Sequence, residues 1–377
     1  MRGFPDREYL QCSHCIMDSN DDPYISFDSF GICNHCTKYA EDEKNYVFKG
    51  DEGVRKMERI VQRMKLEGKG KAYDCIVGIS GGVDSTFLAL LARDLNLRVL
   101  GVHCDNGWNS ELAVNNIENI VKKLKFDLYT YVINWDEFRD IQLAYFKANV
   151  IDIEAITDLA FRAVLLNTSS KYNIKYFLSG DNIATESVLP EAWICKDYAN
   201  LINIHRLFGK IPMKTYPLIK KLKHAFQKRI SPVFNVELLN LMDYRKDEVK
   251  LRIAKELEWR DYGGKHYESI FTRFYQGYIL PNKFGVDKRK AHLSNLICSS
   301  QISRVQAIEA LQEPIYQREM YLSDRKFVLK KLGFSDQEFD EYIQMLPIEH
   351  NKYGLAGTIY DSYPLFKIVR PLIGYFK

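Results

Sequence analysis

The sequence predicts an α/β protein with a parallel-sheet core, a cysteine-rich N-terminal head and a mainly helical C-terminal region. Three observations lead to this fold class. Two C-x2-C pairs lie within the first 40 residues. Short apolar runs typical of buried strands then alternate with helix-patterned stretches of about ten residues or more, which parallel crossovers require. Beyond residue 221 the chain is largely helix-patterned and rich in Tyr, Lys and Arg.

The length and composition fit a globular protein of two or three domains. The chain has 377 residues, of which 46% are hydrophobic and 27% are charged. We expect a zinc-binding head over residues 1–50, a helical connector over 51–70, an α/β domain over 71–220 and a mainly helical region over 221–377. Within the α/β domain, residues of about 190–221 form an insertion.

Composition also bounds the location and the partners of the protein. No run approaches the ~18 apolar residues of a membrane span, and the first residues lack the apolar core of a signal peptide. We therefore expect a cytoplasmic protein whose eight cysteines are reduced. The net charge of +4 is too small to indicate a large nucleic-acid surface, although it suits an anionic small molecule.

The two cysteine pairs of the head predict a structural zinc site. The 17 residues between the pairs fall within the spacing that is typical of a tetrahedral zinc ion with four thiolate ligands. Disulfides or a redox pair are the alternatives. Each pair also encloses a histidine, His14 or His35, which four cysteines make unnecessary as a ligand. The expected ligands are Cys12, Cys15, Cys33 and Cys36.

The sheet is predicted from four apolar runs, and residues 213–218 are a possible fifth strand. Polar loops that contain glycine follow the first, second and fourth runs, beginning at Ser80, Asp105 and Gly180. Because open parallel sheets bind ligands beyond the carboxyl ends of their strands, these loops should converge on one site. The four runs cover residues 73–79, 98–103, 127–133 and 174–178.

The segment Ser80-Gly81-Gly82-Val83-Asp84-Ser85 lies between the first strand and a helix-patterned stretch. A strand, a tight Gly-Gly turn and a helix start direct several backbone N–H groups and a helix dipole at one spot, which is an anion site. Asp84 can hold a magnesium ion against phosphate oxygens. The segment lacks the Walker pattern and resembles the PP-loop of ATP pyrophosphatases, which split ATP between its α and β phosphates. The alternative is a Gly-Gly turn in an ordinary βα unit.

The PP-loop resemblance implies an ATP site of the adenine nucleotide alpha hydrolase type. Asp84 would share Mg2+ with Asp181 and Glu186, because carboxylates at the ends of two strands of one sheet can bind a common cation. Alternatively, Asp181 caps the next helix and Glu186 forms a surface pair. The expected ATP-binding residues are Gly78, Ser80, Gly81, Gly82, Asp84, Ser85, His103, Asn106, Gly180 and Lys283.

A basic block lies beyond the sheet, around Lys283, Lys288 and Arg289. A pyrophosphate leaving group needs cations, so we expect these side chains to contact phosphate. Most charge runs are only solvated helix faces, which is the alternative. Together with Asp84 and Ser85, Lys288 and Arg289 are the expected catalytic residues.

The whole set of motifs resembles the N-acetyl sugar amidotransferase family. The resemblance rests on the four-cysteine head, SGGVDS (80–85), HCDNGW (103–108), SGDNIATES (179–187) and KFGVDKRKAHLSNLICSSQISR (283–304), and it spans about Gln11 to Pro314. It implies a role in bacterial surface polysaccharides, including lipopolysaccharide O-antigen, or in nonulosonic acids. It also implies ATP-dependent conversion of a sugar N-acetyl group to an acetamidino group. The N-acetyl oxygen would attack the α-phosphate, giving an O-adenylyl imidate and pyrophosphate, and ammonia would then displace AMP.

The sugar would bind in the insertion, where aromatic and hydrogen-bonding side chains suit a sugar ring or a uracil. The same side chains could instead pack the insertion against the rest of the protein. The sequence identifies neither the sugar nor its reacting acetamido position. The expected sugar-binding residues are Trp193, Lys196, Asp197 and Arg206.

Ammonia is expected to come from a separate glutaminase. An amidotransferase that hydrolyses its own glutamine needs a nucleophilic cysteine at its mature N-terminus or on a Gly-rich elbow near a His. Position 2 is Arg, and neither Cys195 nor Cys298 lies on such an elbow. The family resemblance suggests partners similar to the glutaminase and cyclase subunits of histidine biosynthesis.

Two other functions remain possible from the motifs. A tRNA-thiolating enzyme can also combine a PP-loop with a zinc ribbon, but it needs reactive cysteines or an iron–sulfur cluster and a basic RNA surface. The sequence offers neither. A zinc-ribbon adaptor with an inactive nucleotide domain is disfavoured because Ser80, Asp84 and Ser85 are all present.

The segment 360–377 is unusually aromatic and apolar for a chain end. We expect it to pack against the protein, because tied-down termini are common. Docking to a partner or to a membrane surface is the alternative.

Overall fold

The fold is built on one parallel sheet, and a computed structural model describes residues 8–219, 232–264 and 267–355. In the described part of the chain, five strands lie in the order β3-β2-β1-β4-β5. The order changes direction between β1 and β4, and ligands of such sheets bind at this switch point. The parallel sheet, the N-terminal cysteine group and the helical C-terminal region confirm the predicted fold class. The strands are β1 (Cys75–Gly78), β2 (Val99–Asp105), β3 (Asp127–Val132), β4 (Tyr176–Leu178) and β5 (Phe234–Val236).

The prediction for the fifth strand is wrong, because residues 213–218 do not form one. Their backbone is held by the carboxylate of Glu137, which accepts N–H groups from Thr215 at 2.9 Å and from Tyr216 at 2.8 Å. The fifth strand is β5, and Phe234 N donates to Lys175 O at 2.7 Å beside its pairing with β4. A side chain from a distant segment therefore decides the conformation of residues 213–218, which their local pattern does not reveal.

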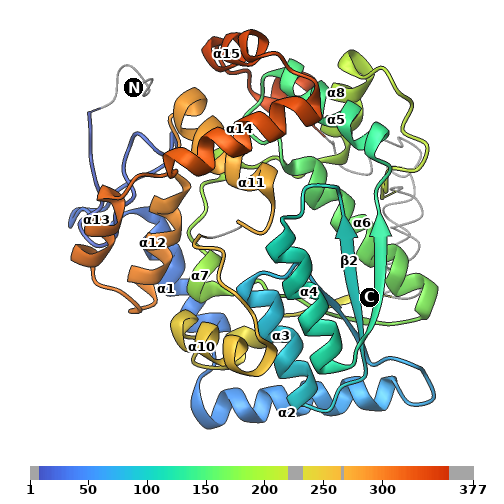
Figure 1. The fold of residues 1–377 in the computed structure, drawn as a ribbon. Helices are drawn as coiled ribbons and strands as arrows, with labels where there is room; N and C mark the ends of the chain where they lie inside the picture. Colours follow the sequence, from blue (N-terminus) through green and yellow to red (C-terminus); the bar gives the residue numbers. More distant parts are fainter. Residues whose placement is uncertain (1–7, 220–231, 265–266, 356–377) are drawn as a thin grey trace, which may run out of the picture.

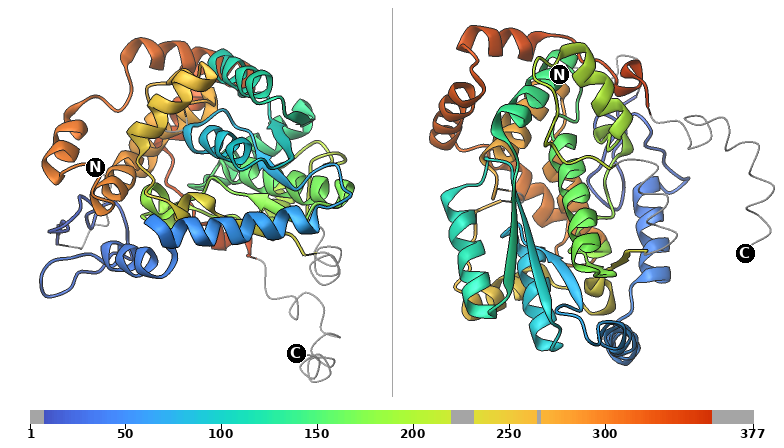
Figure 2. Two further views of the ribbon diagram at one scale, coloured as in Figure 1. Left: turned by 90° about the horizontal axis from the view of Figure 1, so that it is seen from below. Right: turned by 90° about the vertical axis from the view of Figure 1, so that its right-hand side faces the viewer.

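Helices cover both faces of the sheet, so the core has three layers (Figure 2). Side chains of a strand alternate between the two faces. Val77 of β1 packs on the face that is covered by four helices. These are α2 (Gly50–Glu67), α3 (Val83–Asp94), α4 (Glu111–Leu124) and α10 (Lys246–Leu257). Ile76 of β1 packs on the other side with residues of α6 (Ala155–Tyr172). Most of the central strand is thereby buried on both faces, as its apolar sequence predicts.

A second, larger hydrophobic cluster joins helices that lie beyond the carboxyl ends of the strands, among them α5 and α8 above the tip of β2 in Figure 1. Its aromatic core includes Phe138, Tyr145, Phe274 and Phe339, which are fully buried. This cluster places a layer of helices over the edge of the sheet at which the loops converge. The helices are α5 (Trp135–Ala148), α8 (Tyr198–Phe208), α11 (Ile270–Phe274), α14 (Arg318–Leu332) and α15 (Asp336–Gln344), with the π-helical stretch η3 (Tyr275–Phe284).

The head packs beside this helical region rather than on the sheet (Figure 1). Its knuckles lead into α1 (Asn34–Tyr46), which contacts α12 (Lys288–Cys298) and the one-turn helix α7 (Ile183–Glu186). The remaining short elements are α13 (Arg304–Gln312), η1 (Glu191–Trp193), η2 (Leu238–Leu241) and η4 (His350–Tyr353).

No helix within residues 8–219, 232–264 and 267–355 combines the length and the hydropathy needed to cross a membrane. Two expectations fall outside the described residues: the packing of the segment 360–377, and the last two residues of the insertion at 190–221.

Candidate functional site

The loop after β1 has the geometry of an anion-binding turn. Gly81 has a φ of +84°, a conformation that L side chains rarely adopt. A Cβ at this position would lie 3.0 Å from the hydroxyl of Tyr262, so the turn is also tightly packed. Gly82 is extended and immediately precedes α3, whose N-terminal N–H groups and dipole face the turn. The backbone therefore has the strand–turn–helix geometry that the sequence predicts, and the binding of phosphate to it stays a prediction.

Side chains from elsewhere in the chain hold this loop in place. The indole N–H of Trp259 donates to Gly81 O at 2.8 Å, and the hydroxyl of Tyr262 donates to the same oxygen. Within the loop, the hydroxyls of Ser80 and Ser85 lie 2.9 Å apart. Trp259 and Tyr262 follow α10, and no local signal could assign them to a loop about 180 residues earlier.

Asp84 lies in the first turn of α3 and receives a hydrogen bond from the hydroxyl of Tyr244. Burial, and then the charge of Asp84, raises the pKa of Tyr244 well above its ordinary value. Tyr244 thus stays protonated and orients the carboxylate as a donor. It is a site residue that the sequence analysis missed.

The loop after β4 meets the loop after β1. A Cβ on Gly180 would lie 3.4 Å from Asp84 Cβ and 3.4 Å from the backbone nitrogen of Ser85. Burial, and then the charge of Glu186, raises the pKa of Asp181, although Asp181 is exposed at the surface. Glu186 also raises the pKa of Tyr244. The structure thereby brings Asp84, Asp181 and Glu186 into one neighbourhood.

These three carboxylates are near one another without forming a closed metal cage. In the described ranges, there are two groups of three or more potential metal ligands within 4.8 Å of one another: the four cysteines of the head, and His14 and Cys36 of the head with Cys298 of α12. A magnesium ion shared by Asp84, Asp181 and Glu186 would need additional oxygens, as Mg2+ bound to substrate phosphates has. The N-cap of α7 is Asn182, which accepts from Thr185 N at 3.0 Å, so Asp181 does not cap that helix.

Three other predicted ATP-binding residues serve the packing of the strands. A Cβ on Gly78 would lie 2.6 Å from the ring of Phe161, so this glycine allows α6 to approach the sheet. His103 donates from Nδ1 to Ile79 O at 2.8 Å and accepts at Nε2 from Asn109 at 3.0 Å. Asn106 donates to Thr157 Oγ1 at 3.1 Å. Both polar side chains are buried.

A second group of charged side chains lies next to the carboxylates. Lys196 Nζ lies 2.9 Å from Asp158 Oδ2, and the charges of both residues act on Asp181. Burial raises the pKa of Glu154 to about 7 and that of Asp152 to about 6, while the charge of Lys288 opposes both shifts. Lys196 and Lys288 are thus the predicted cations that lie among the acidic groups of this edge.

Two of the other predicted sugar-binding residues, Trp193 and Asp197, bond to backbone groups of the protein. Trp193 is buried, and its indole N–H donates to Asp21 O of the head at 2.7 Å. Asp197 caps α8 by accepting N–H groups from Ala199 at 2.7 Å and Asn200 at 2.9 Å. Arg206 lies exposed in the last turn of α8. Trp193 therefore packs the insertion against the head, and Asp197 caps the start of α8. A packing role was the alternative to sugar binding for these residues.

Two residues of the basic block are also held within the helical region. The Lys283 side chain is 2% exposed, and its ammonium donates to Tyr342 O and to Met345 O at the end of α15. Arg289 pairs with Asp287 at 2.8 Å and donates to Glu313 O at 2.7 Å. Lys283 and Arg289 therefore have protein partners and do not point toward the loop at Ser80. The carbonyls that they contact lie at the C-terminal ends of helices, where the regular N–H partners are missing.

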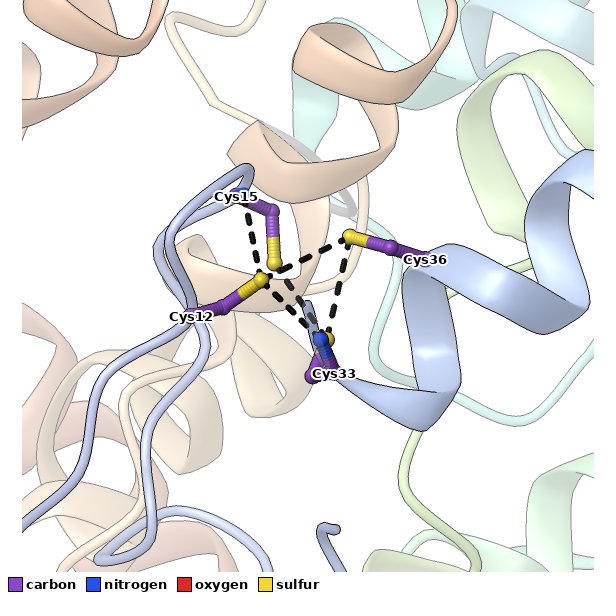
Figure 3. A group of neighbouring side chains, drawn as sticks. All are labelled: Cys12, Cys15, Cys33 and Cys36. Atoms are coloured by element: carbon purple, nitrogen blue, oxygen red, sulfur yellow. Dashed lines mark hydrogen bonds between the residues drawn. The ribbon is translucent and has the colours of Figure 1, made fainter. Parts of the chain in front are cut away.

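The four cysteines of the head form one buried group (Figure 3). Sulfur pairs within it lie 3.7–3.8 Å apart. Four thiolates at about 2.3 Å from a tetrahedral zinc ion lie about 3.8 Å from one another, so the group has the dimensions of a zinc site. Backbone N–H groups support the sulfurs, including Cys33 N to Cys12 Sγ at 3.3 Å. These four residues could hold a metal ion, and His35 instead contacts Asp22 at 2.8 Å.

Comparison with known proteins divides the chain into two recognisable parts. Residues 55–164, which include the loop at Ser80, match the family model for NAD synthase. Residues 268–365, which include α12, match the family model for the C-terminal domain of WbpG-like LPS (lipopolysaccharide) biosynthesis proteins. The chain thus joins an NAD synthase-like PP-loop domain to a WbpG-like C-terminal domain. No curated protein matches the sequence.

Solved structures of two synthetases resemble the chain at low identity. One is NMN synthetase from Francisella tularensis, with 14% identity and a TM-score of 0.36 over 80% of this chain and 98% of that chain. Another is the NH3-dependent NAD synthetase from Campylobacter jejuni subsp. jejuni in complex with the nitrate ion, with 13% identity and a TM-score of 0.31 over 78% of this chain and 98% of that chain.

Proposed function

We propose that this chain, which joins an NAD synthase-like PP-loop domain to a WbpG-like C-terminal domain, is an ATP-dependent amidotransferase of lipopolysaccharide or related sugar biosynthesis. It converts the N-acetyl group of a nucleotide-linked or nonulosonic-acid sugar to an acetamidino group. The observation that carries the proposal is the combination of these two domains with the anion turn at Gly81 and the adjoining carboxylates. An ATP site alone would fit many ligases, and the C-terminal domain supports a sugar substrate.

The first step is the transfer of AMP to the sugar. The N-acetyl oxygen attacks the α-phosphorus of ATP, the bond from that phosphorus to the bridging oxygen breaks, and pyrophosphate leaves. The amide nitrogen gives up its proton to water as the C=N bond of the imidate forms. The N–H groups of the turn at Gly81 and the hydroxyls of Ser80 and Ser85 support this assignment as donors to phosphate oxygens. Asp84, Asp181 and Glu186 would hold Mg2+, which neutralises charge on the departing pyrophosphate. Lys288 is the nearby cation suited to the same charge.

In the second step, ammonia attacks the imidate carbon, and the bond to the AMP oxygen breaks. The attacking nitrogen must lose a proton. Glu154 suits this role, since burial places its pKa at about 7, close to a neutral working pH. Asp158, whose charge acts on Glu154, and its partner Lys196 are candidates for contacts to the sugar or to the imidate.

The remaining parts of the chain are assigned to assembly. The four head cysteines hold a structural zinc ion; their thiolates fill its coordination, so this ion activates no water. Ammonia reaches the site from a separate glutaminase, with a cyclase-like subunit as the second partner. We place the reaction in the cytoplasm, where ATP and nucleotide-linked sugars are available.

The test measures AMP and pyrophosphate release by the purified chain with ATP, ammonium and a panel of N-acetyl sugars. We expect release that depends on the sugar and a product in which an amidine replaces the amide, detected by mass spectrometry. Release that depends on tRNA and a sulfur donor would favour the thiolating enzyme. A chain that binds ATP but releases no pyrophosphate with any sugar would favour the adaptor.

A further inference from the structure

A second group of potential metal ligands lies beside the four head cysteines. His14, Cys36 and Cys298 bring one imidazole nitrogen and two sulfurs within 4.8 Å of one another. Cys36 Sγ lies 3.7 Å from Cys298 Sγ and 3.4 Å from His14 Nδ1. Cys298 Sγ lies 4.0 Å from His14 Nδ1. Cys36 therefore belongs to both groups.

The spacing of this second group fits a metal ion as well as that of the first. Around a tetrahedral zinc ion, two thiolates lie about 3.8 Å apart, and a thiolate and an imidazole nitrogen lie about 3.6 Å apart. The distance of 3.7 Å between Cys36 and Cys298 equals the distances within the four-cysteine group. The distances from His14 Nδ1 to the two sulfurs, 3.4 and 4.0 Å, lie on either side of the value of about 3.6 Å for a thiolate and an imidazole nitrogen.

The convergence of these side chains does not follow from the knuckle pattern. Cys298 is 262 residues from Cys36 and is the last residue of α12. That helix is fixed against the head by other bonds: Lys290 contacts Asp18 at 2.6 Å, and Ser294 Oγ accepts from Ile16 N at 3.3 Å. The thiol of Cys298 is thus held at the head by contacts that are independent of it.

We propose that the head holds two metal ions that share the thiolate of Cys36. The first ion has the ligands Cys12, Cys15, Cys33 and Cys36, and the second has Cys36, Cys298 and His14. Both ions are zinc, because thiolate and imidazole ligands in a tetrahedral arrangement select it. Three protein ligands leave the second ion one position for water, and His14 is exposed while Cys298 is half-buried. The second zinc ion therefore exchanges with solvent more readily than the first.

Charge also favours the second ion. One zinc ion with four thiolates carries two excess negative charges. A second zinc ion with one further thiolate and a neutral imidazole reduces this excess to one. Sharing a buried thiolate between two cations therefore relieves repulsion among the sulfurs, and it links α12 to the head through a metal.

The zinc content of the full-length chain tests the proposal. We expect two zinc ions per chain after saturation with zinc and desalting, one in a Cys298→Ser variant, and two in a Cys195→Ser control. A chromophoric chelator should remove zinc from the unmodified chain in a fast and a slow phase of equal size. The fast phase should be absent from Cys298→Ser and should require less chelator in His14→Ala.

A second measurement covers the case in which Cys298→Ser fails to fold. In the chain loaded with cobalt(II), two ions that share a thiolate couple magnetically, so the moment per ion falls below that of isolated tetrahedral cobalt. Uncoupled cobalt ions, or a single zinc ion in both the unmodified chain and a folded Cys298→Ser variant, would overturn the proposal.

Discussion

Asp84 stands where three segments of the chain meet. It lies in the first turn of α3, its Cβ lies next to the glycine of the loop after β4, and its carboxylate accepts a hydrogen bond from the hydroxyl of Tyr244. Replacing the carboxylate with an amide keeps the shape and the hydrogen-bond acceptor but removes the charge. The Asp84→Asn substitution therefore tests the effect of the charge on phosphate chemistry without changing the packing.

The Asp84→Asn variant should remain folded and lose most of its turnover. The lost charge weakens the binding of Mg-pyrophosphate in the transition state, a term of roughly 3–4 kcal/mol in comparable sites. Pyrophosphate release at saturating ATP measures it. Asp127→Asn, a similar change at the opposite edge of the sheet, should leave release unchanged. Retention of more than half of the normal release by Asp84→Asn would contradict the site.

The sequence predicted local structure well around two groups of candidate site residues, whose functional roles stay predictions. The spacing of the cysteine pairs and the glycines of the turn at Gly81 identify their own structures, because each depends on neighbours in the chain. Trp193 and Lys283 were assigned to ligands and instead bond to backbone carbonyls of distant elements. A polar side chain in a loop looks the same in sequence whether it meets a ligand or another loop.

At the scale of an element, the loop before α6 is a pH-sensitive part of the site. It holds buried Asp152 and partly buried Glu154 two residues apart, and desolvation raises the pKa values of both carboxyl groups. The carboxylate of Asp152 accepts a hydrogen bond from the backbone N–H of Cys195 at 2.7 Å, and that of Glu154 accepts one from the hydroxyl of Thr272. The loop therefore joins the insertion and α11 through two carboxyl groups that resist ionisation.

The Glu154→Gln variant should change how stability depends on pH. In the folded protein the pKa of Glu154 is about 7, above its value of about 4.3 in an unfolded chain. Its contribution to stability is therefore complete below pH 4 and is lost as the pH rises toward 7. Between pH 5 and pH 8, thermal melting should fall less in Glu154→Gln than in the unmodified chain. The exposed Glu111→Gln variant is the control and should melt like the unmodified chain. An equal fall in Glu154→Gln and in the unmodified chain would refute this account.

Helix α12 should be needed to keep the head attached. Lys290 pairs with Asp18 and Asp21, whose side chains are only 2% and 3% exposed. Lys290→Met leaves these carboxylates without their cation, at a cost of roughly 3–5 kcal/mol for a buried pair. Urea denaturation should show a large loss of stability, while exposed Lys65→Met should show almost none. A stability within about 1 kcal/mol of normal would mean that the pair contributes little.

At the scale of the molecule, the proposed reaction depends on a partner for its nitrogen. The purified chain should turn over, releasing more than one pyrophosphate per chain, with ammonium and not with glutamine alone. Adding the glutaminase should restore activity with glutamine, because ammonia passed directly between proteins avoids protonation at neutral pH. Coupled assays with either nitrogen source measure this. Glutamine hydrolysis by the chain alone, abolished in Cys195→Ser or Cys298→Ser, would show an intrinsic glutaminase.

The sheet was predictable because its central strands are continuous apolar runs with polar loops at one end. The helical layer above it was predicted only as helical. Its cluster is assembled from segments far apart in the chain, from Cys12 of the head to Ile343 of α15, and aromatic contacts such as that of Phe146 with Tyr342, 4.8 Å between ring centroids, bring α5 and α15 together. Pairings of this kind depend on which helix faces meet, and one sequence gives no record of them.

The contacts of α12 repeat with the period of the helix. Lys290, Ser294 and Cys298 recur every four residues and face the head, while Asn295, on a neighbouring stripe, bonds both backbone groups of Val188. One inserted residue would turn everything after it by about 100°, so Cys298 would leave the head and Asn295 would leave Val188 together. Substitutions along this helix are therefore easier to accommodate than any change in its length, and the count of residues from Lys290 to Cys298 is itself a determinant of the assembly.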